Sequence, residues 1–219
     1  KIDTVIHLAS RLASFDNIDD ISILKDNIRI TENLVFMIKK LRPKFLINFS
    51  SMAVYPNISG SYSENSLPMP QKNNDCIYGL SKYTSEVLLD FLLENEEIRK
   101  VHLRVSQVYG KGMRQDRIVS TMKNELEKNN TITLYGNGNR ENCFIEIGKL
   151  AKLINYLLKN KVNGLYNIGD ENISYINLAK KIIENHGNSK STLIMKSKGS
   201  QEKFYLDFSR MKKELNIDD

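Results

Sequence analysis

Short apolar segments alternate with long amphipathic ones along most of this chain, and that alternation limits the possible folds most strongly. Residues 3–9 and 44–51 are largely apolar, as expected of strands that are buried on both faces of a sheet. The segment 19–41 between them has helical periodicity and stops before Pro43. Strands and helices in alternation predict an α/β protein built on a parallel sheet.

The same pattern continues toward the carboxyl end of the chain. We expect further strands at 101–105, 132–135, 143–147, 165–168 and 193–195, and further helices at 77–97, 115–128, 149–159, 176–185 and 209–215. The segment 56–74 is rich in Pro, Asn and Ser and shows no period, so we expect a long loop of the kind that usually serves a function. We interpret Gly136-Asn137-Gly138 as a turn.

The composition excludes several functional classes. No apolar run approaches the ~20 residues of a membrane span, so no membrane is expected as a partner. The two cysteines, Cys76 and Cys143, match neither a disulfide framework nor a metal motif, which predicts free thiols, no metal site and a cytoplasmic location. The net charge of +6 suits an anionic ligand such as a diphosphate. No basic run is interleaved with aromatic residues, so nucleic-acid binding is not expected.

One candidate for chemistry is a tyrosine–lysine pair in the segment CIYGLSKYTSE (76–86). Helical spacing places Tyr78 and Lys82 on the same face, one turn apart. An isolated tyrosine has a pKa near ~10, and a neighbouring ammonium favours the phenolate, so we expect Lys82 to lower the pKa of Tyr78. Such tuning suits acid–base catalysis at neutral pH. The spacing alone is a weak signal, because about one such pair is expected by chance.

Polar residues follow three of the predicted strands. They are His7 to Ser10 after the first strand, Ser50-Ser51 at the end of the second, and Ser106-Gln107 after the strand at 101–105. The carboxyl ends of parallel strands meet at one edge of the sheet, where α/β proteins bind ligands. The sequence therefore predicts that Ser51, Tyr78 and Lys82 meet in a single cleft at this edge.

Several motifs, in a fixed order, resemble one known family. They are DTVIHLAS (3–10), Asn27 in the following helix, INFSSMAVYP (47–56), YGLSK (78–82), LRVSQVYGKGMR (103–114), ITLYGNGNRENCFIEI (132–147) and GLYNIGDE (164–171). This set is similar to the NAD-dependent nucleotide-sugar epimerase/dehydratase family of extended short-chain dehydrogenases/reductases. The resemblance covers nearly the whole chain, and its motifs are specific together although each is modest alone.

The resemblance implies roles for individual residues. The catalytic residues would be Ser51, Tyr78 and Lys82. The cofactor would be NAD, with NADP also possible, and it would be bound by Leu8, Ala9, Ser10, Asn27, Ser50, Tyr78, Lys82 and Ser106. The substrate would be a nucleotide-diphosphate sugar held by Ser51, Met52, Gln107, Arg140 and Lys203. His7 is expected to be a structural residue at the end of its strand.

The resemblance also implies a domain organisation. Residues 1–108 would be the carboxyl-terminal half of a Rossmann-like dinucleotide-binding domain. Residues 109–219 would form mainly a small α/β substrate-binding part, with 143–168 returning to the first domain. The family's opening Gly-rich GxxGxxG turn and its first βαβ units have no counterpart here, so we expect the chain to be a fragment of a longer polypeptide. A homodimer paired through the helices at 19–41 and 77–97 is implied as well.

Departures from the family pattern narrow the chemistry. Met52 and Ala53 stand where sugar 4,6-dehydratases carry an acidic pair. Decarboxylating relatives have a glutamate in place of Ala53, and 3,5-epimerase/reductases have a cysteine there. These three chemistries are therefore disfavoured, which leaves 4-epimerisation or reduction of a 4-keto sugar. A non-catalytic relative is a further alternative, but the presence of Ser51, Tyr78 and Lys82 together argues against it.

Overall fold

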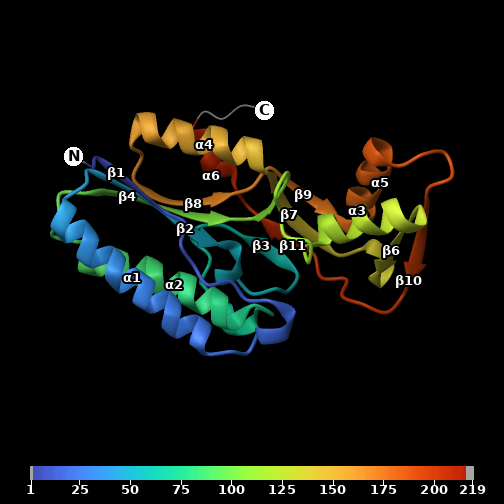
Figure 1. Cartoon of the computed structure of the whole chain (residues 1–219), viewed down its shortest axis with the longest axis horizontal. Coiled ribbons are helices and arrows are strands. Elements are labelled where there is room, and N and C mark those ends of the chain that lie inside the picture. The colour runs from blue at the N-terminus through green and yellow to red at the C-terminus, as the bar shows by residue number, and fades with distance from the viewer. Residues whose placement is uncertain (1, 216–219) are drawn as a thin grey trace.

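The structure is a computed structural model that describes residues 2–215. Lys1, with which the expected first domain begins, and residues 216–219, with which the second ends, lie outside this range. The described chain forms a larger part around a parallel sheet and a smaller part beside it (Figure 1). The cleft described below is lined by residues from both parts.

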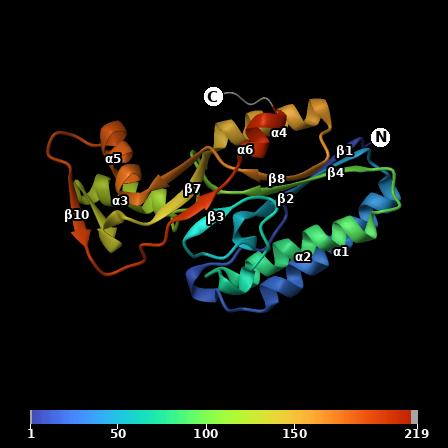
Figure 2. The same cartoon turned by 180° about the vertical axis from the view of Figure 1, so that it is seen from behind.

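A four-stranded parallel sheet forms the centre of the larger part, with the strand order β1-β2-β4-β8. Its strands are Thr4–His7 (β1), Phe45–Ser51 (β2), Arg99–Val105 (β4) and Gly164–Ile168 (β8). Helices α1 (Ser22–Leu41) and α2 (Cys76–Leu92) cover one face, and α4 (Ile147–Asn160) and α6 (Ser209–Leu215) cover the other (Figures 1 and 2). This architecture confirms the predicted Rossmann-like α/β fold class.

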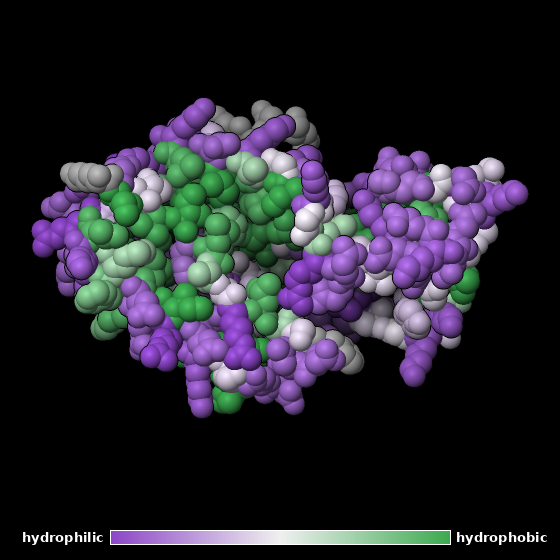
Figure 3. Space-filling model, viewed as in Figure 1, coloured by the Kyte–Doolittle hydropathy of each residue, from purple (hydrophilic) through white to green (hydrophobic). Residues whose placement is uncertain are grey.

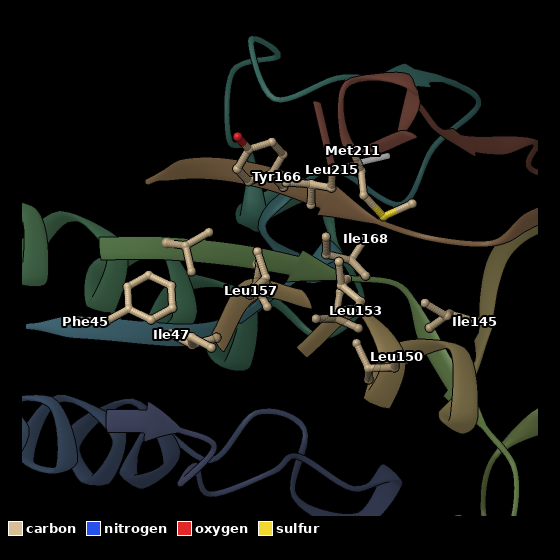
Figure 4. Packing of buried hydrophobic residues seen from close by; sticks show 13 residues of the cluster. Phe45, Ile47, Ile145, Leu150, Leu153, Leu157, Tyr166, Ile168, Met211 and Leu215 are labelled. Atoms are coloured by element: carbon tan, nitrogen blue, oxygen red, sulfur yellow. The ribbon is translucent and has the colours of Figure 1, made fainter. Parts of the chain in front are cut away.

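Alternating side chains of β2 explain why its sequence begins with three consecutive apolar residues, Phe45, Leu46 and Ile47. Phe45 and Ile47 point into the core beneath α4 and α6 (Figure 4), whereas Leu46 packs with α1 and α2 on the opposite face. Successive residues of a strand face opposite sides of its sheet, so a strand that is covered on both sides has no solvent-facing position. All three side chains are fully buried.

The smaller part has a core of its own, formed around two helices and short strands. The helices are α3 (Ile118–Asn129) and α5 (Tyr175–His186), and β6 (Thr131–Tyr135) pairs in parallel with β10 (Thr192–Lys196). A three-stranded sheet joins this core to the larger part and consists of β5 (Gln107–Tyr109), β7 (Glu141–Glu146) and β9 (Glu171–Ser174). The predicted turn at Gly136–Gly138 is present as a 3-10 turn.

The predicted loop at 56–74 is only partly a loop. It contains β3 (Gly60–Tyr62), which pairs in parallel with β11 (Phe204–Leu206), and a short 3-10 helix at Pro70–Lys72. These strands are three residues long and far apart in sequence, so no local periodicity signals them. The strands β5 and β9 were missed for the same reason. Helix α2 also ends at Leu92, earlier than the predicted residue 97.

We propose the domain division expected from the sequence, with a boundary after residue 108. In its support, α4 and β8 pack in the core of the main sheet although they follow the first strands of the smaller part in sequence. Strand β7, which precedes α4, stays in the three-stranded sheet. The chain thus crosses between the two parts more than once.

The two parts differ in surface character (Figure 3). Apolar surface gathers on the larger part, in the region where Figure 1 places β1 and α4, while the visible face of the smaller part is mostly hydrophilic. Exposed apolar side chains near β1 include Ile6, Leu8 and Leu12. Among the described residues, no helix combines the length and the apolar character that a membrane crossing would require.

Candidate active site

A cleft of about 670 Å³ lies at the carboxyl edge of the main sheet. Its lining includes Ser51 and Met52 after β2, Tyr78 in the first turn of α2, and Gln107 after β4. Residues of the smaller part, among them Arg140, complete the opposite wall. The position agrees with the general rule that parallel α/β sheets bind ligands beyond the carboxyl ends of their strands.

Ser51 and Tyr78 are brought together by a tight contact between two backbones. The Ser51 hydroxyl accepts a hydrogen bond from the Ala53 amide at 3.1 Å and so caps the 3-10 turn Met52–Val54. Helix α2 packs against this turn so closely that a Cβ on Gly79 would lie 2.1 Å from the Ala53 carbonyl oxygen. Glycine is therefore required beside Tyr78 for the helix to approach the end of β2.

The Tyr78 phenol is a protonated group at neutral pH. Burial raises the pKa of Tyr78 to about 12, against the opposing effects of the Arg117 guanidinium and of hydrogen bonds with the Ser51 and Ser10 hydroxyls, while the Asp75 carboxylate raises it further. The expectation of a lowered pKa for Tyr78 is therefore wrong, because the burial of the phenol outweighs the attraction of the Arg117 guanidinium.

Lys82 lies one turn further along α2, behind Tyr78. Its Nζ is 5.8 Å from the centre of the Tyr78 ring, and the residue is only 6% exposed. Burial lowers the pKa of Lys82 to about 8, and the Glu86 carboxylate opposes that change. Within residues 2–215 no hydrogen bond or ion pair reaches the Lys82 ammonium. Ser51 and Tyr78 line the cleft, whereas Lys82 is not among its lining residues. His7 is buried as expected, and its burial together with Lys82 lowers the pKa of His7 to about 4.

Asn27, an expected cofactor contact, is fully engaged with the protein. Its Oδ1 accepts hydrogen bonds from the Arg11 amide at 2.6 Å and from the Ser10 hydroxyl at 3.2 Å. Its Nδ2 donates to the Arg11 carbonyl at 3.0 Å and to the Ser81 hydroxyl at 2.9 Å. The side chain thus fixes the loop after β1 to both α1 and α2, which positions Ser10 beside Tyr78.

The other expected cofactor contacts differ in accessibility. Leu8 and Ala9 are exposed at the end of β1. Ser106 is buried, and its hydroxyl lies beside the Cys143 thiol without a hydrogen bond to any nitrogen or oxygen of the described chain. Ser50 is 4% exposed and donates its hydroxyl hydrogen bond to Glu86, away from the cleft. Ser50 and Ser51 therefore face opposite sides of β2.

Of the expected substrate contacts, all but one line the cleft. Met52, Gln107 and Arg140 belong to its lining together with Ser51, whereas Lys203 does not. Arg140 donates a hydrogen bond from Nη2 to the Asn57 side-chain oxygen at 3.3 Å, which holds the guanidinium at the wall. The Lys203 ammonium lies 3.6 Å from a Glu141 carboxylate oxygen, and its side chain is well exposed.

Two further arginines in the lining were missed by the sequence analysis. Arg114 makes a two-pronged ion pair with Asp116, at 3.0 and 2.5 Å, whereas Arg117 is 3.9 Å from the same carboxylate. Asp116 therefore neutralises Arg114 more than Arg117. Both arginines lie in the loop before α3, and the basic residues clustered around the start of the predicted helix at 115–128 were the available signal.

A buried ion pair behind the cleft was also missed. Glu86 and Arg104 are 5% and 3% exposed, and the guanidinium binds both carboxylate oxygens, at 3.0 and 2.7 Å. Arg104 also donates to the Tyr55 phenol oxygen at 2.9 Å, and Tyr55 donates to the Asn167 Oδ1 at 2.8 Å. The signal in the sequence was a glutamate at helical spacing after Lys82, on the face of α2 that must be buried.

A parallel α/β sheet with serine, tyrosine and lysine grouped at its carboxyl edge defines the class of short-chain dehydrogenases/reductases. The model of the "NAD dependent epimerase/dehydratase family" matches residues 1–169. The chain belongs to this family. Membership confirms the resemblance seen in the sequence and the expected class of enzyme, and NAD is the cofactor that the family's description names.

Similar proteins support this assignment. The chain is 27% identical to the "Putative UDP-glucose 4-epimerase" of Methanocaldococcus jannaschii, over 95% of this chain and 70% of that protein. It is also 27% identical to the dTDP-4-dehydro-6-deoxyglucose reductase of Escherichia coli, over 84% of this chain and 58% of that protein. The solved UDP-glucuronic acid 4-epimerase from Bacillus cereus in complex with NAD superimposes with a TM-score of 0.82 at 25% identity, covering 99% of this chain and 69% of that one.

Two groups at the site fit the nicotinamide end of such a cofactor. The Lys82 ammonium has no acceptor among the described residues, and the Ser106 hydroxyl is buried beside a thiol without a nitrogen or oxygen partner. The hydroxyl and amide groups of a nicotinamide nucleoside offer the acceptors and donors that these side chains lack. The residues present therefore fit the cofactor named for the family.

Proposed function

We propose that the protein is an NAD(P)-dependent nucleotide-sugar 4-epimerase. The observation that carries this proposal is that Ser51 and Tyr78 line the same cleft, with Lys82 one helical turn behind Tyr78. Met52 and Ala53 follow Ser51 without any acidic group, so Ser51 and Tyr78 offer proton transfer at one sugar oxygen, and the two positions after Ser51 offer no acid or base for removing water. Epimerisation at one carbon requires no more than that.

The residues of the chain would act on the oxygen at C4 of the sugar. The Ser51 hydroxyl would hold this oxygen by a hydrogen bond, and Tyr78 would exchange a proton with it as the 4-keto sugar forms and is reduced again. The bound nicotinamide supplies the acceptor and donor of the two electrons. Lys82, Ser10 and Ser106, with the exposed residues Leu8 and Ala9, would hold the cofactor end that faces Tyr78.

Substrate recognition would fall to the opposite wall. Arg140 is held at the cleft through Asn57, without an ion pair to a carboxylate in the described chain, and it would bind the diphosphate. Met52 and Gln107 would contact the sugar. Because Lys203 lies outside the cleft lining and pairs with Glu141, we leave it out of the proposed substrate site.

Reduction of a 4-keto nucleotide sugar is the second candidate. It is favoured by the protonated state of Tyr78, since a phenol with a pKa of about 12 can give a proton to a keto oxygen but is a poor base at neutral pH. Epimerisation needs both directions of that transfer, and would need further cationic groups near Tyr78 to stabilise the phenolate. The reductase of Escherichia coli among the similar proteins agrees with this alternative.

Tyr78→Phe in the full-length protein tests the shared mechanism. We expect turnover of nucleotide sugars to fall by at least about 10³-fold, because the proton donor is lost, with cofactor affinity nearly unchanged. Tyr83→Phe is the matched control, since Tyr83 lies on the same helix but does not line the cleft. A Tyr78→Phe protein with near-normal turnover would refute the assignment.

The two candidates are separated by what happens to the cofactor. An epimerase interconverts UDP- or dTDP-sugars at C4 with no net change in nicotinamide absorbance, whereas a reductase consumes reduced cofactor in proportion to a 4-keto substrate. A chromatographic assay of a panel of nucleotide sugars, read together with absorbance at the nicotinamide band, distinguishes these outcomes. No conversion of any of them would favour a non-catalytic member of the family.

We also propose that the protein is a homodimer joined through α1 and α2. In support, Phe36 on α1 and Phe91 on α2 are 71% and 73% exposed, and Val87 is also exposed on α2. Large aromatic side chains exposed on adjacent helices are a common mark of protein–protein contact. Sedimentation of the full-length protein at the mass of a single chain would contradict this.

The free thiols of Cys76 and Cys143 support a reducing, cytoplasmic location.

A further inference from the structure

Lys82 is buried in surroundings that favour its neutral amine over its charged ammonium form. The residue is 6% exposed, no hydrogen bond or ion pair within residues 2–215 reaches its ammonium, and burial favours the neutral amine. His7 on β1 and Tyr78 on α2 also face Lys82, and both are uncharged at neutral pH because their own pKa values are shifted away from it. Neither residue can therefore stabilise the ammonium by charge.

Glu86 is the group that can stabilise the Lys82 ammonium by charge. It lies four residues after Lys82 on α2, so the two side chains share one face of the helix. The Glu86 carboxylate is 5% exposed and is held in place by both prongs of Arg104, on β4, and by the Ser50 hydroxyl, on β2. The Glu86 carboxylate raises the pKa of Lys82 and so opposes the effect of burial on the ammonium.

We propose that Glu86, clamped by Arg104 and Ser50, is a positioning residue that keeps the Lys82 ammonium charged and directed toward the cleft. Glu86 does not line the cleft. It acts through Lys82, and through Ser50 it also fixes the strand end that carries Ser51. The Glu86–Arg104 ion pair thus supports two residues of the proposed catalytic set from behind.

The titration of Lys82 in solution tests this directly. The ¹³Cε chemical shift of Lys82 can be followed against pH in full-length protein labelled at lysine, with the signal assigned by Lys82→Arg. In Glu86→Gln we expect the midpoint to fall by about one pH unit relative to the wild type, since an opposite charge close by shifts a pKa by one or more units. Glu94→Gln is the control, because it removes the same charge from an exposed position beyond the end of α2 and should leave the midpoint unchanged.

A second variant keeps the test decisive if Glu86→Gln fails to fold with Arg104 left unpaired. The double variant Glu86→Gln/Arg104→Met removes both buried charges and should also lower the midpoint, by less than the single variant, because the repulsion from Arg104 is lost as well. A midpoint that is unchanged or raised in the variant that folds overturns the proposal.

A kinetic measurement adds a second readout that depends on the proposed function. As pH rises, turnover should be lost when Lys82 is deprotonated, and this alkaline limb should move to lower pH in Glu86→Gln by the same amount as the chemical-shift midpoint. A purely structural role for Glu86 would lower stability and turnover without moving the limb. If no nucleotide sugar is turned over at all, the proposed function fails while the chemical-shift titration still decides the role of Glu86.

Discussion

The two walls of the cleft present polar groups in opposite ways. On the α2 wall, made by Ser51, Tyr78 and the Lys82 behind them, the side chains are held in a partly dry environment that shifts the pKa values of both ionisable groups. On the arginine wall, made by Arg114, Arg117 and Arg140, the guanidinium groups are accessible, with Arg114 and Arg117 side chains 36% and 46% exposed.

This difference separates chemistry from binding. Burial changes the proton affinity of a group, which acid–base catalysis requires, but it costs stability when the group is charged. Accessible cations keep their ordinary charge and can pair with an anionic ligand at low cost. The α2 wall is therefore suited to proton transfer, and the arginine wall to holding a diphosphate.

The contrast between the two walls predicts its largest effect for Lys82→Met, and the quantity that changes is the free energy of unfolding. The pKa of Lys82 is lowered from 10.5 to about 8 on folding, so below pH 8 the folded protein holds a charged group that the unfolded chain solvates better. We expect Lys82→Met to increase the free energy of unfolding by about 2 kcal/mol at pH 7. The gain should fade as pH rises from about 8 to above 10.5, where the lysine is neutral in both states.

Urea denaturation at pH 7 and at pH 10.5 measures this gain. Lys25→Met is the matched control, because Lys25 is an exposed lysine on α1, and its change should stay within about 0.5 kcal/mol at both pH values. If Lys82→Met is less stable than the wild type at pH 7, then burying the charge of Lys82 does not cost stability. The proposed contrast between the two walls would then be wrong.

A smaller effect is expected for Arg140→Gln on the arginine wall, and the quantity that changes is the affinity for UDP. Loss of one charge-assisted contact should weaken the binding of UDP about tenfold, equivalent to about 1.4 kcal/mol, while the free energy of unfolding changes little. Isothermal titration of the full-length protein with UDP measures the affinity. The weakening should diminish at high salt, since accessible charges are screened.

Lys203→Gln sharpens the same measurement. Lys203 is outside the cleft lining and is paired with Glu141, so we expect UDP affinity within about twofold of the wild type, as for an ordinary surface ion pair. If Arg140→Gln and Lys203→Gln lose equal affinity for UDP, Lys203 belongs to the diphosphate site after all. The arginine wall would then include Lys203.

Much of the fold could be predicted because buried strands can be recognised from runs of apolar residues in the sequence. In β2 the consecutive residues Phe45, Leu46 and Ile47 are apolar and buried, since helices cover both faces of the sheet. The grouping of Ser51 with Tyr78 also followed from local rules, because one ends a parallel strand and the other begins the next helix. The pairing of β3 with β11 could not be predicted, since it joins two short segments that are remote in sequence.

By itself, the sequence determined the order of strands and helices and the family, and it located the edge where Ser51, Tyr78 and Gln107 would lie. Only the tertiary structure decided the protonation of Tyr78, the engagement of Asn27 with the loop after β1, and the buried Glu86–Arg104 pair behind Lys82. Periodicity and motifs report which residues lie on one face or at one strand end. A pKa or an ion pair depends on how much water and which charges surround a group, and those neighbours come from distant parts of the chain.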